Sequence, residues 1–345
     1  MKQVFVVLVL MFLGFSHAQD RIEIVEDEVD TITLRHAFGE TTIPKNPERV
    51  IIADPLTLGA YASLGEVPLA ACGYPLDTGV GKFGLLVTPL LEGATEHLGG
   101  CQSFGSGFPL EQMLTLDPDL ILIGAGLAGQ ENSYTLLSEI APTVAIPFDG
   151  SERLRYFEDI ARVVGKEEVA QTRIQAHYDR LADIEAQLTD PVDIVVVSLR
   201  SAGLTLYGAD FSVNTSLVRM GLTFEPAVSS LPSYLPEQQR ARDLSFERLD
   251  LLDSADLIII EENAVGSENQ EVLEEQVNSP LWQSLSAVQQ GNILFINQGE
   301  LFATASILSF EEVAGQVANF LEERGFLAPA EDEETDMEAT EEASD

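Results

Sequence analysis

The stretch Pro109-Leu-Glu-Gln-Met-Leu-Thr-Leu-Asp-Pro-Asp-Leu-Ile-Leu-Ile123 decides the fold, because the chain repeats it. The second copy, Leu244-Ser-Phe-Glu-Arg-Leu-Asp-Leu-Leu-Asp-Ser-Ala-Asp-Leu-Ile-Ile-Ile260, lies about 136 residues further on. Each copy has a Glu at the head of a helically spaced segment, followed by an Asp-Leu-Ile apolar run. This change of period predicts a short amphipathic helix and then a strand buried on both faces. One repeat at this distance indicates two similar lobes, and two lobes imply a ligand cleft.

Short apolar runs and helically spaced segments alternate on both sides of each copy. The runs predict strands at residues 49–53, 67–73, 143–147, 193–199, 204–207 and 293–296. The spacing predicts helices at residues 56–64, 136–141, 215–220, 283–290 and 310–324. Residues 32–38 alternate like an edge strand, and 39–47 are turn-rich. The alternation is typical of an α/β fold with parallel sheets covered by helices.

Residues 151–189 have helical spacing throughout and contain no strand pattern. We therefore expect two Rossmann-like lobes joined by a long helical connector, with the ligand cleft between the lobes. The expected divisions are a signal peptide at 1–18, an N-terminal lobe at 31–150, the connector at 151–189, a C-terminal lobe at 190–328 and a disordered acidic tail at 329–345.

The first residues have the features of a secretory signal. Lys2 supplies a positive start, an apolar stretch follows, and Ser16-His-Ala18 is a small-x-small cleavage site. The apolar stretch is too short for a permanent membrane helix, and the residue after the cleavage site is Gln19 rather than a lipidated Cys. We expect an exported, periplasmic protein without a lipid anchor.

The chain is strongly acidic. Without Lys2 it has 17 basic and 57 acidic residues, a formal charge of −40. Nine of the acids lie in residues 331–345, which have no apolar periodicity and are expected to be disordered. This charge excludes nucleic acid and anionic lipid as partners.

Cys72 and Cys101 are the only cysteines. An exported chain favours a disulfide between them, although two free buried thiols are the alternative.

Four further segments, read together with the repeat, carry a family resemblance. They are Ile43-Pro-Lys-Asn-Pro-Glu-Arg-Val50, Leu206-Tyr-Gly-Ala-Asp-Phe211 followed by 217–222, Ser279-Pro-Leu-Trp-Gln-Ser-Leu-Ser-Ala-Val288, and Gly291-Asn-Ile-Leu-Phe295. Over residues 40–325 the chain resembles the class III substrate-binding proteins of ABC importers for iron-siderophores, haem and cobalamin. The resemblance implies two lobes joined by a long helix, capture of a ferric siderophore and delivery to an ABC permease. It implies no catalysis and no cofactor, and we expect a monomer.

The resemblance also gives the repeated glutamates a role. At the matching position of each lobe, a surface Glu of the family docks onto permease arginines, which here points to Glu111 and Glu247. A purely structural role at a helix start is the alternative, and the two roles are compatible.

The ligand-contacting residues are expected on loops at the carboxyl ends of strands. Arg200 is the first candidate, because its rigid fork of donors suits an oxygen-rich anionic chelate; an ion pair in an acidic protein is the alternative. The aromatic candidates and the weaker basic ones are Tyr74, Phe104, Tyr234, Phe302, Arg240 and Arg242.

Three rival functions have weaker support. The run from Gly124 to Gly129 matches a dinucleotide fingerprint, with Asp149 twenty residues further on, but the export signal opposes this reading. His36, His97 and His177 are scattered, so no direct metal site is expected and they are interpreted as surface residues. A hydrolase lacks a Gly-x-Ser-x-Gly elbow. Haem or cobalamin in place of a siderophore stays open.

Overall fold

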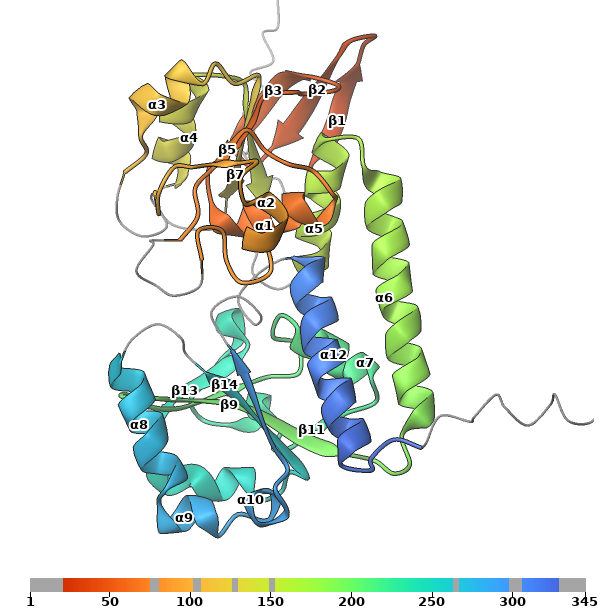
Figure 1. Cartoon of the computed structure of the whole chain (residues 1–345), viewed down its shortest axis with the longest axis vertical. Coiled ribbons are helices and arrows are strands. Elements are labelled where there is room, and N and C mark those ends of the chain that lie inside the picture. Colours follow the sequence, from red (N-terminus) through yellow and green to blue (C-terminus); the bar gives the residue numbers. More distant parts are fainter. Residues whose placement is uncertain are drawn as a thin grey trace, which may run out of the picture.

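The computed structural model describes residues 21–74, 81–101, 107–125, 130–148, 153–262, 267–297 and 306–328. The expected leader and acidic tail lie outside these residues, as do Phe104, Phe302 and Asp149. Within the described chain, no helix is both long and apolar enough to cross a membrane. The two lobes are stacked, with long helices along one side of both (Figure 1).

The first lobe is built on a five-stranded parallel sheet with the order β6-β5-β4-β7-β8. Its strands are β4 (Val50–Ile52), β5 (Ala70–Ala71), β6 (Glu96–His97), β7 (Leu120–Ala125) and β8 (Thr143–Pro147). The helices are α1 (Pro55–Ser63), α2 (Thr88–Leu91), α3 (Leu110–Thr115) and α4 (Gln130–Ser138). The expected strand over 67–73 is much shorter, since only two residues pair.

The first copy of the repeat supplies β7, an inner strand of this sheet between β4 and β8. Ile121 and Ile123 of β7 pack with Met113 of α3 on one face, while Leu120 and Leu122 pack on the other. All four β7 side chains are at most 2 % exposed, so this strand is covered on both faces as its sequence predicts.

The second lobe is built on a mixed seven-stranded sheet with the order β12-β13-β10-β9-β14-β15, and β11 pairs with β9. Its strands are β9 (Asp193–Arg200), β10 (Gly203–Tyr207), β11 (Thr223–Phe224), β12 (Tyr234–Leu235), β13 (Arg240–Leu244), β14 (Leu257–Glu262) and β15 (Ile293–Asn297). The antiparallel strands β12 and β13 have no apolar run that would predict them. The second copy of the repeat supplies β14 as expected, but its helix is the 3-10 helix η4 (Phe246–Leu252).

Helices cover both faces of the second sheet. One face packs on η4, α8 (Ser267–Val277), α9 (Pro280–Gln283) and α10 (Ser286–Gln290), with Trp282 buried among them. The other face packs on α7 (Asn214–Arg219) and the C-terminal helix α12 (Ile307–Glu323). The apolar core on the α7 and α12 face is continuous with the core of the first lobe, so the two lobes share apolar packing.

Residues 151–189 supply two helices, α5 (Arg153–Val163) and α6 (Glu167–Gln187). Helix α5 packs on α1 and β8 of the first lobe, so of these two helices only α6 runs along both lobes (Figure 1). The closing helix α12 lies beside α6 and reaches α1 of the first lobe. Two helices therefore link the lobes, where the sequence predicts one connector.

The polar contacts at this junction tie three helices together. Arg173 of α6 donates to the Ser63 carbonyl oxygen of α1 at 2.6 Å and pairs with Glu311 of α12. The Ser63 hydroxyl lies 2.7 Å from the Ser306 hydroxyl, which caps α12. We call Ser63, Arg173, Ser306 and Glu311 the lobe junction.

Two expectations near the N-terminus are wrong. The strand expected over 32–38 is β2 (Thr31–His36), and it is the middle strand of a separate antiparallel sheet between β1 (Glu23–Asp27) and β3 (Gly39–Pro44). The expected turn-rich connection over 39–47 begins as β3, because Thr and Ile support a strand despite the flanking Gly and Pro.

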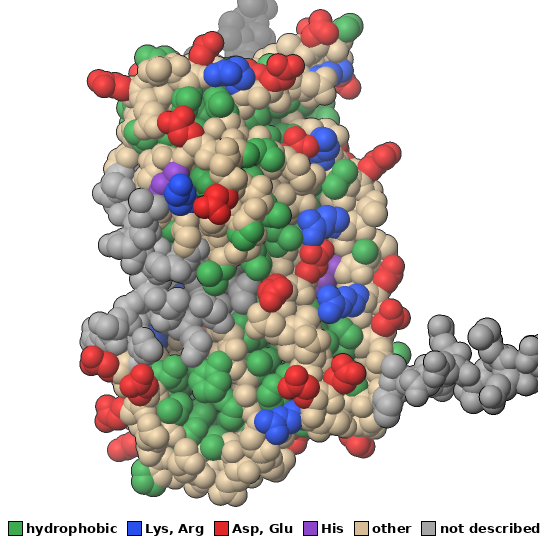
Figure 2. All heavy atoms as spheres, viewed as in Figure 1, with side chains coloured by type: hydrophobic (Ala, Val, Ile, Leu, Met, Phe, Trp, Pro, Cys, Tyr) green, Lys and Arg blue, Asp and Glu red, His purple; other side chains and the backbone are tan. Residues whose placement is uncertain are grey.

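Carboxylates lie over both lobes and along the connector on the face seen in Figure 2.

The disulfide expected from the sequence is present: Cys72 and Cys101, which are 29 positions apart in sequence, are bonded. It joins the end of β5 to the turn after β6.

We predict that replacing both residues, Cys72→Ala with Cys101→Ala, lowers the free energy of unfolding by about 3–4 kcal/mol, because the unfolded chain gains the entropy of an open loop. Urea denaturation measures the loss. Dithiothreitol should reproduce it in the wild type and leave the double variant unchanged; equal stability of the two proteins would contradict this prediction.

Candidate functional site

The arginines of the second lobe share one face of its sheet. Arg200 ends β9 on the same face as Val196, which belongs to the core shared with the first lobe. Arg240 pairs with Tyr207 of β10, another member of that core. Alternation in β13 places Arg242 on the same face as Arg240, opposite the buried Ala241. We call Arg200, Arg240 and Arg242 the arginine face.

Arg200 is held by groups of its own lobe. Its Nε donates to the Ser198 hydroxyl at 3.0 Å, and its Nη2 donates to the Tyr207 hydroxyl at 3.3 Å. The Nη2 also lies 3.6 Å from Oε2 of Glu261, a β14 carboxylate that is 2 % exposed. Burial lowers the pKa of Arg200, but Tyr207 and Glu261 outweigh it and the net shift is upward. Both roles considered for Arg200 fit this geometry, since an ion pair to a buried Glu still leaves its side chain 29 % exposed.

An arginine of the first lobe faces this surface. Arg153 opens α5, and its guanidinium lies 5.3 Å from the ring centre of Phe148, just after β8. Burial and the positive charge of Arg240 lower the pKa of Arg153 to about 10, which leaves it protonated at neutral pH. Two like charges from different lobes thus repel each other, and an anion between them would relieve the repulsion.

The other candidates are dispersed around the lobes. Tyr74 follows β5 and lies beside the disulfide in sequence, and its backbone N–H donates to the Lys82 carbonyl oxygen at 2.8 Å. Tyr234 pairs with Ala241 and packs against the core on the far side of the second sheet from the arginine face. Arg242 is exposed. The structure therefore groups Arg200 with Arg240 and Arg242 but separates them from Tyr234.

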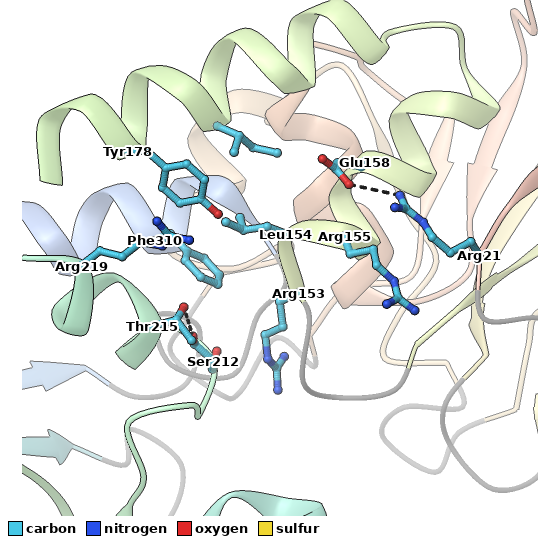
Figure 3. A pocket seen from close by; sticks show the side chains of 11 residues that line it. Arg21, Arg153, Leu154, Arg155, Glu158, Tyr178, Ser212, Thr215, Arg219 and Phe310 are labelled. Carbon is cyan, nitrogen blue, oxygen red and sulfur yellow. Dashed lines mark hydrogen bonds and ion pairs between the residues drawn. The ribbon is translucent and has the colours of Figure 1, made fainter. Parts of the chain in front are cut away.

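A pocket of about 450 Å³ lies where α5, α6, α7 and α12 meet. Its lining includes Arg153 and Arg155 of α5, Tyr178 of α6, Arg219 of α7 and Phe310 of α12. Arg219, Thr215 and Ser212 lie on one side of it and Arg155 and Arg21 on the other, as Figure 3 shows. We call this space the connector pocket; the sequence pattern did not indicate it.

Two of the three histidines expected at the surface, His36 and His177, are buried, whereas His97 is half-buried. His36 is 2 % exposed and lies 2.9 Å from the Thr41 hydroxyl, and His177 is 3 % exposed and lies 2.9 Å from the Ser216 hydroxyl. Burial lowers the pKa of each to about 4, so both are neutral at pH 7. No cluster of three or more His, Cys, Asp or Glu in the described residues could hold a metal ion.

The glycine run that resembles a dinucleotide fingerprint has a packing reason at its first position. A Cβ on Gly124 would lie 2.8 Å from the Tyr156 hydroxyl, so a side chain cannot fit there. The Gly124 N–H donates to the buried Asp54 carboxylate at 2.8 Å. The residues from 126 to 129 lie outside the described chain.

Glu111 and Glu247 occupy matching positions in the two lobes. Each is exposed in the first turn of the short helix that precedes the repeated strand. The hydroxyl of Ser245 accepts a hydrogen bond from the Glu247 N–H at 3.3 Å, so this helix start is capped without the Glu carboxylate. Neither carboxylate forms an ion pair with a described residue.

The fold is that of two α/β lobes joined by helices along one side, with arginines gathered on one face of the second sheet. The chain belongs to the periplasmic binding protein family, whose model matches residues 105–298. It is 24 % identical over 274 residues to the iron(3+)-hydroxamate-binding protein FhuD of Bacillus subtilis, covering 76 % of this chain and 78 % of that protein. It is 23 % identical over 289 residues to the Fe(3+) dicitrate-binding periplasmic protein FecB of Escherichia coli, covering 82 % and 87 %.

Solved structures share the fold. A periplasmic solute-binding protein from Mycobacterium smegmatis aligns with a TM-score of 0.65 at 26 % identity, covering 85 % of this chain and 98 % of that one. Staphylococcus aureus SirA, solved with staphyloferrin B, aligns with a TM-score of 0.66 at 21 % identity, covering 84 % and 98 %. These likenesses confirm the two-lobed architecture expected from the sequence.

The repulsion between Arg153 and Arg240 gives a testable stability effect. We predict that Arg240→Gln raises the free energy of unfolding by up to about 1 kcal/mol, because it removes a like charge facing Arg153. Urea denaturation at low and high salt measures the effect, which should shrink with salt.

Arg242→Gln is the matched control, because Arg242 is exposed on the same strand. Its charge is not among the causes that lower the pKa of Arg153. A destabilised Arg240→Gln protein, or an equal gain from both variants, would contradict the assignment of repulsion to this pair.

Proposed function

We propose that this chain captures an anionic ferric siderophore between its lobes and delivers it to the membrane subunits of an ABC importer. Membership of the family supports the class of function, and the names of FhuD, FecB and SirA associate iron chelates with relatives of this fold. The observation that carries the proposal is that Arg200, Arg240 and Arg242 share one face of the second sheet. Arg153 of the first lobe lies close enough for the charge of Arg240 to lower its pKa. In a chain with 57 acidic and 18 basic residues, arginines concentrated between the lobes favour an anionic ligand.

Arg153 joins Arg200 and Arg242 as a ligand-contacting candidate in this proposal. Guanidinium groups meet carboxylate, catecholate and hydroxamate oxygens with paired donors, and two lobes that each contribute one hold the chelate from both sides. In this proposal the iron is held by its chelator, and the protein contacts the chelate rather than the iron. The same proposal includes export of the protein to the periplasm by a cleaved signal peptide, without a lipid anchor.

A ligand panel tests this function. Mature protein should bind at least one anionic ferric chelate with micromolar or tighter affinity in isothermal titration calorimetry. Calorimetry is preferable to Trp fluorescence, because Trp282 is 3 % exposed in the core on the far face of the second sheet. The panel should contain ferric citrate, ferric hydroxamates, ferric catecholates, haem, cobalamin and NAD.

We predict that Arg153→Gln weakens chelate binding by about tenfold or more, as loss of a charge-assisted contact does. Arg248→Gln is the control, because Arg248 is exposed and pairs only locally, with Asp250 at 3.0 Å. Binding of NAD alone, or of nothing in the panel, would overturn the proposed function.

We also propose that Glu111 and Glu247 dock onto permease arginines. Their matching positions, their exposure and the absence of an ion pair to the described residues support this role. Two carboxylates, one on each lobe, offer a two-point contact for arginine side chains.

We predict that Glu111→Lys combined with Glu247→Lys leaves chelate affinity within about twofold but abolishes uptake in cells that depend on this importer. The control reverses one exposed Glu in each lobe away from the repeat, Glu139→Lys with Glu274→Lys, and should preserve uptake. Uptake that survives reversal of Glu111 and Glu247 would sink the docking role.

A further inference from the structure

The connector pocket concentrates positive charge in an acidic protein. The sequence has fourteen arginines, and four of them, Arg21, Arg153, Arg155 and Arg219, line this one pocket. Among the described residues, the lining has a single carboxylate, that of Glu158, which pairs with Arg21 at 3.1 Å. The lining thus carries more guanidinium than carboxylate charge, the opposite of the surface as a whole.

Two of the basic groups are positioned by neighbours. The guanidinium of Arg219 lies 4.1 Å from the ring centre of Tyr178, a stacked geometry that fixes its plane. No carboxylate of the described chain pairs with it. Arg21 is held between Glu158 and the buried Asp159, so its charge is already balanced. Arg219 of the second lobe can therefore contact a ligand in the pocket from the side opposite Arg155 of the first lobe.

A buried hydroxyl completes the polar part of the pocket. Ser212 is 2 % exposed, lines the pocket, and its hydroxyl has no hydrogen-bond partner in the described structure. Its backbone N-to-Cα angle φ is 43°, a left-handed conformation that a Ser rarely adopts. The neighbouring Thr215 hydroxyl donates to the Ser212 carbonyl oxygen at 2.9 Å. A buried hydroxyl without a partner is unfavourable, and a ligand oxygen would accept its hydrogen bond.

The remaining lining is apolar. Leu154, Ile174 and Phe310 face the same space as the arginines. A volume of about 450 Å³ lies within the range of small-molecule sites and is far larger than inorganic phosphate requires. The combination suits a ligand with a carbon framework and several carboxylates.

We propose that the connector pocket binds a small organic polycarboxylate, with Arg155 contacting it from the first lobe and Arg219 and Ser212 from the second. The site adjoins the proposed chelate site, because Arg153 lines it as well, but its contacts to Arg155, Arg219 and Ser212 are its own and it needs no iron. Because it touches α5 and α7, its ligand bridges the two lobes beside the connector helix. Occupancy therefore stabilises one relative position of the lobes.

Tricarballylate is the probe, because it is a tricarboxylate without the hydroxyl that citrate uses to hold iron. The wild-type mature protein should bind it in calorimetry, and its melting temperature should rise with tricarballylate concentration. Arg155→Gln and Arg219→Gln should each weaken binding about tenfold or more. Arg248→Gln should bind as the wild type does.

Ser212→Ala separates binding from folding, because it removes a hydroxyl that has no partner. This variant should melt at or above the wild-type temperature yet bind tricarballylate more weakly. Circular dichroism and melting curves of every variant check that the fold is kept.

Four outcomes would overturn the proposal: no tricarballylate binding at millimolar concentration, an equal loss in Arg248→Gln, unchanged binding in both pocket variants, or phosphate binding as tight as tricarballylate binding. Ferric-chelate titrations distinguish this site from the proposed function. Arg155→Gln should keep chelate affinity, and its loss together with tricarballylate binding would show one site rather than two.

Discussion

The lobe junction fixes how the two sheets stand relative to each other. Arg173 contacts α1 through the Ser63 carbonyl and α12 through Glu311, so one side chain joins the connector to both other helices. The approach of α1 and α12 is close at Gly59, where a Cβ would lie 3.2 Å from the Ser306 Cβ, a tight contact. Because the core is also continuous across this junction, rotating the lobes apart would expose apolar surface and break the Arg173 contacts.

The same constraint determines where positive charge collects. Once the sheets are fixed, Arg153 at the start of α5 must face Arg240 at the start of β13, and Arg219 must lie across the connector pocket from Arg155. Such arrangements cost stability in the free protein, since like charges are held together and a Ser212 hydroxyl is buried without a partner. Binding sites commonly retain local costs of this kind, which an anionic ligand offsets.

The sequence predicted those parts of the fold that have a clear period. The strands β7 and β14, the helix α6 and the two-lobed arrangement follow from runs and spacing that local physics dictates. The strands β12 and β13 were missed because Tyr234-Leu235 and Arg240–Leu244 have no apolar run, and their pairing is non-local. His36 and His177 were misjudged because each is buried against a hydroxyl of another element, Thr41 of β3 and Ser216 of α7. Arg153 was overlooked since it begins a helix that the pattern assigned to a connector.

The second lobe-crossing helix changes what the long connector can do. A single helix between lobes could act as a flexible spacer, whereas α6 lies beside α12, and α12 begins next to α1 and runs into the second lobe. Any closure around a ligand must then slide α12 along α6 or bend both, and each movement works against Arg173 and its two partners. We therefore expect ligand capture to depend on the arginine charges between the lobes, with little change in the relative position of the lobes. The repeated glutamates, in the first turns of α3 and η4, belong to lobes whose relative movement is opposed by the same contacts.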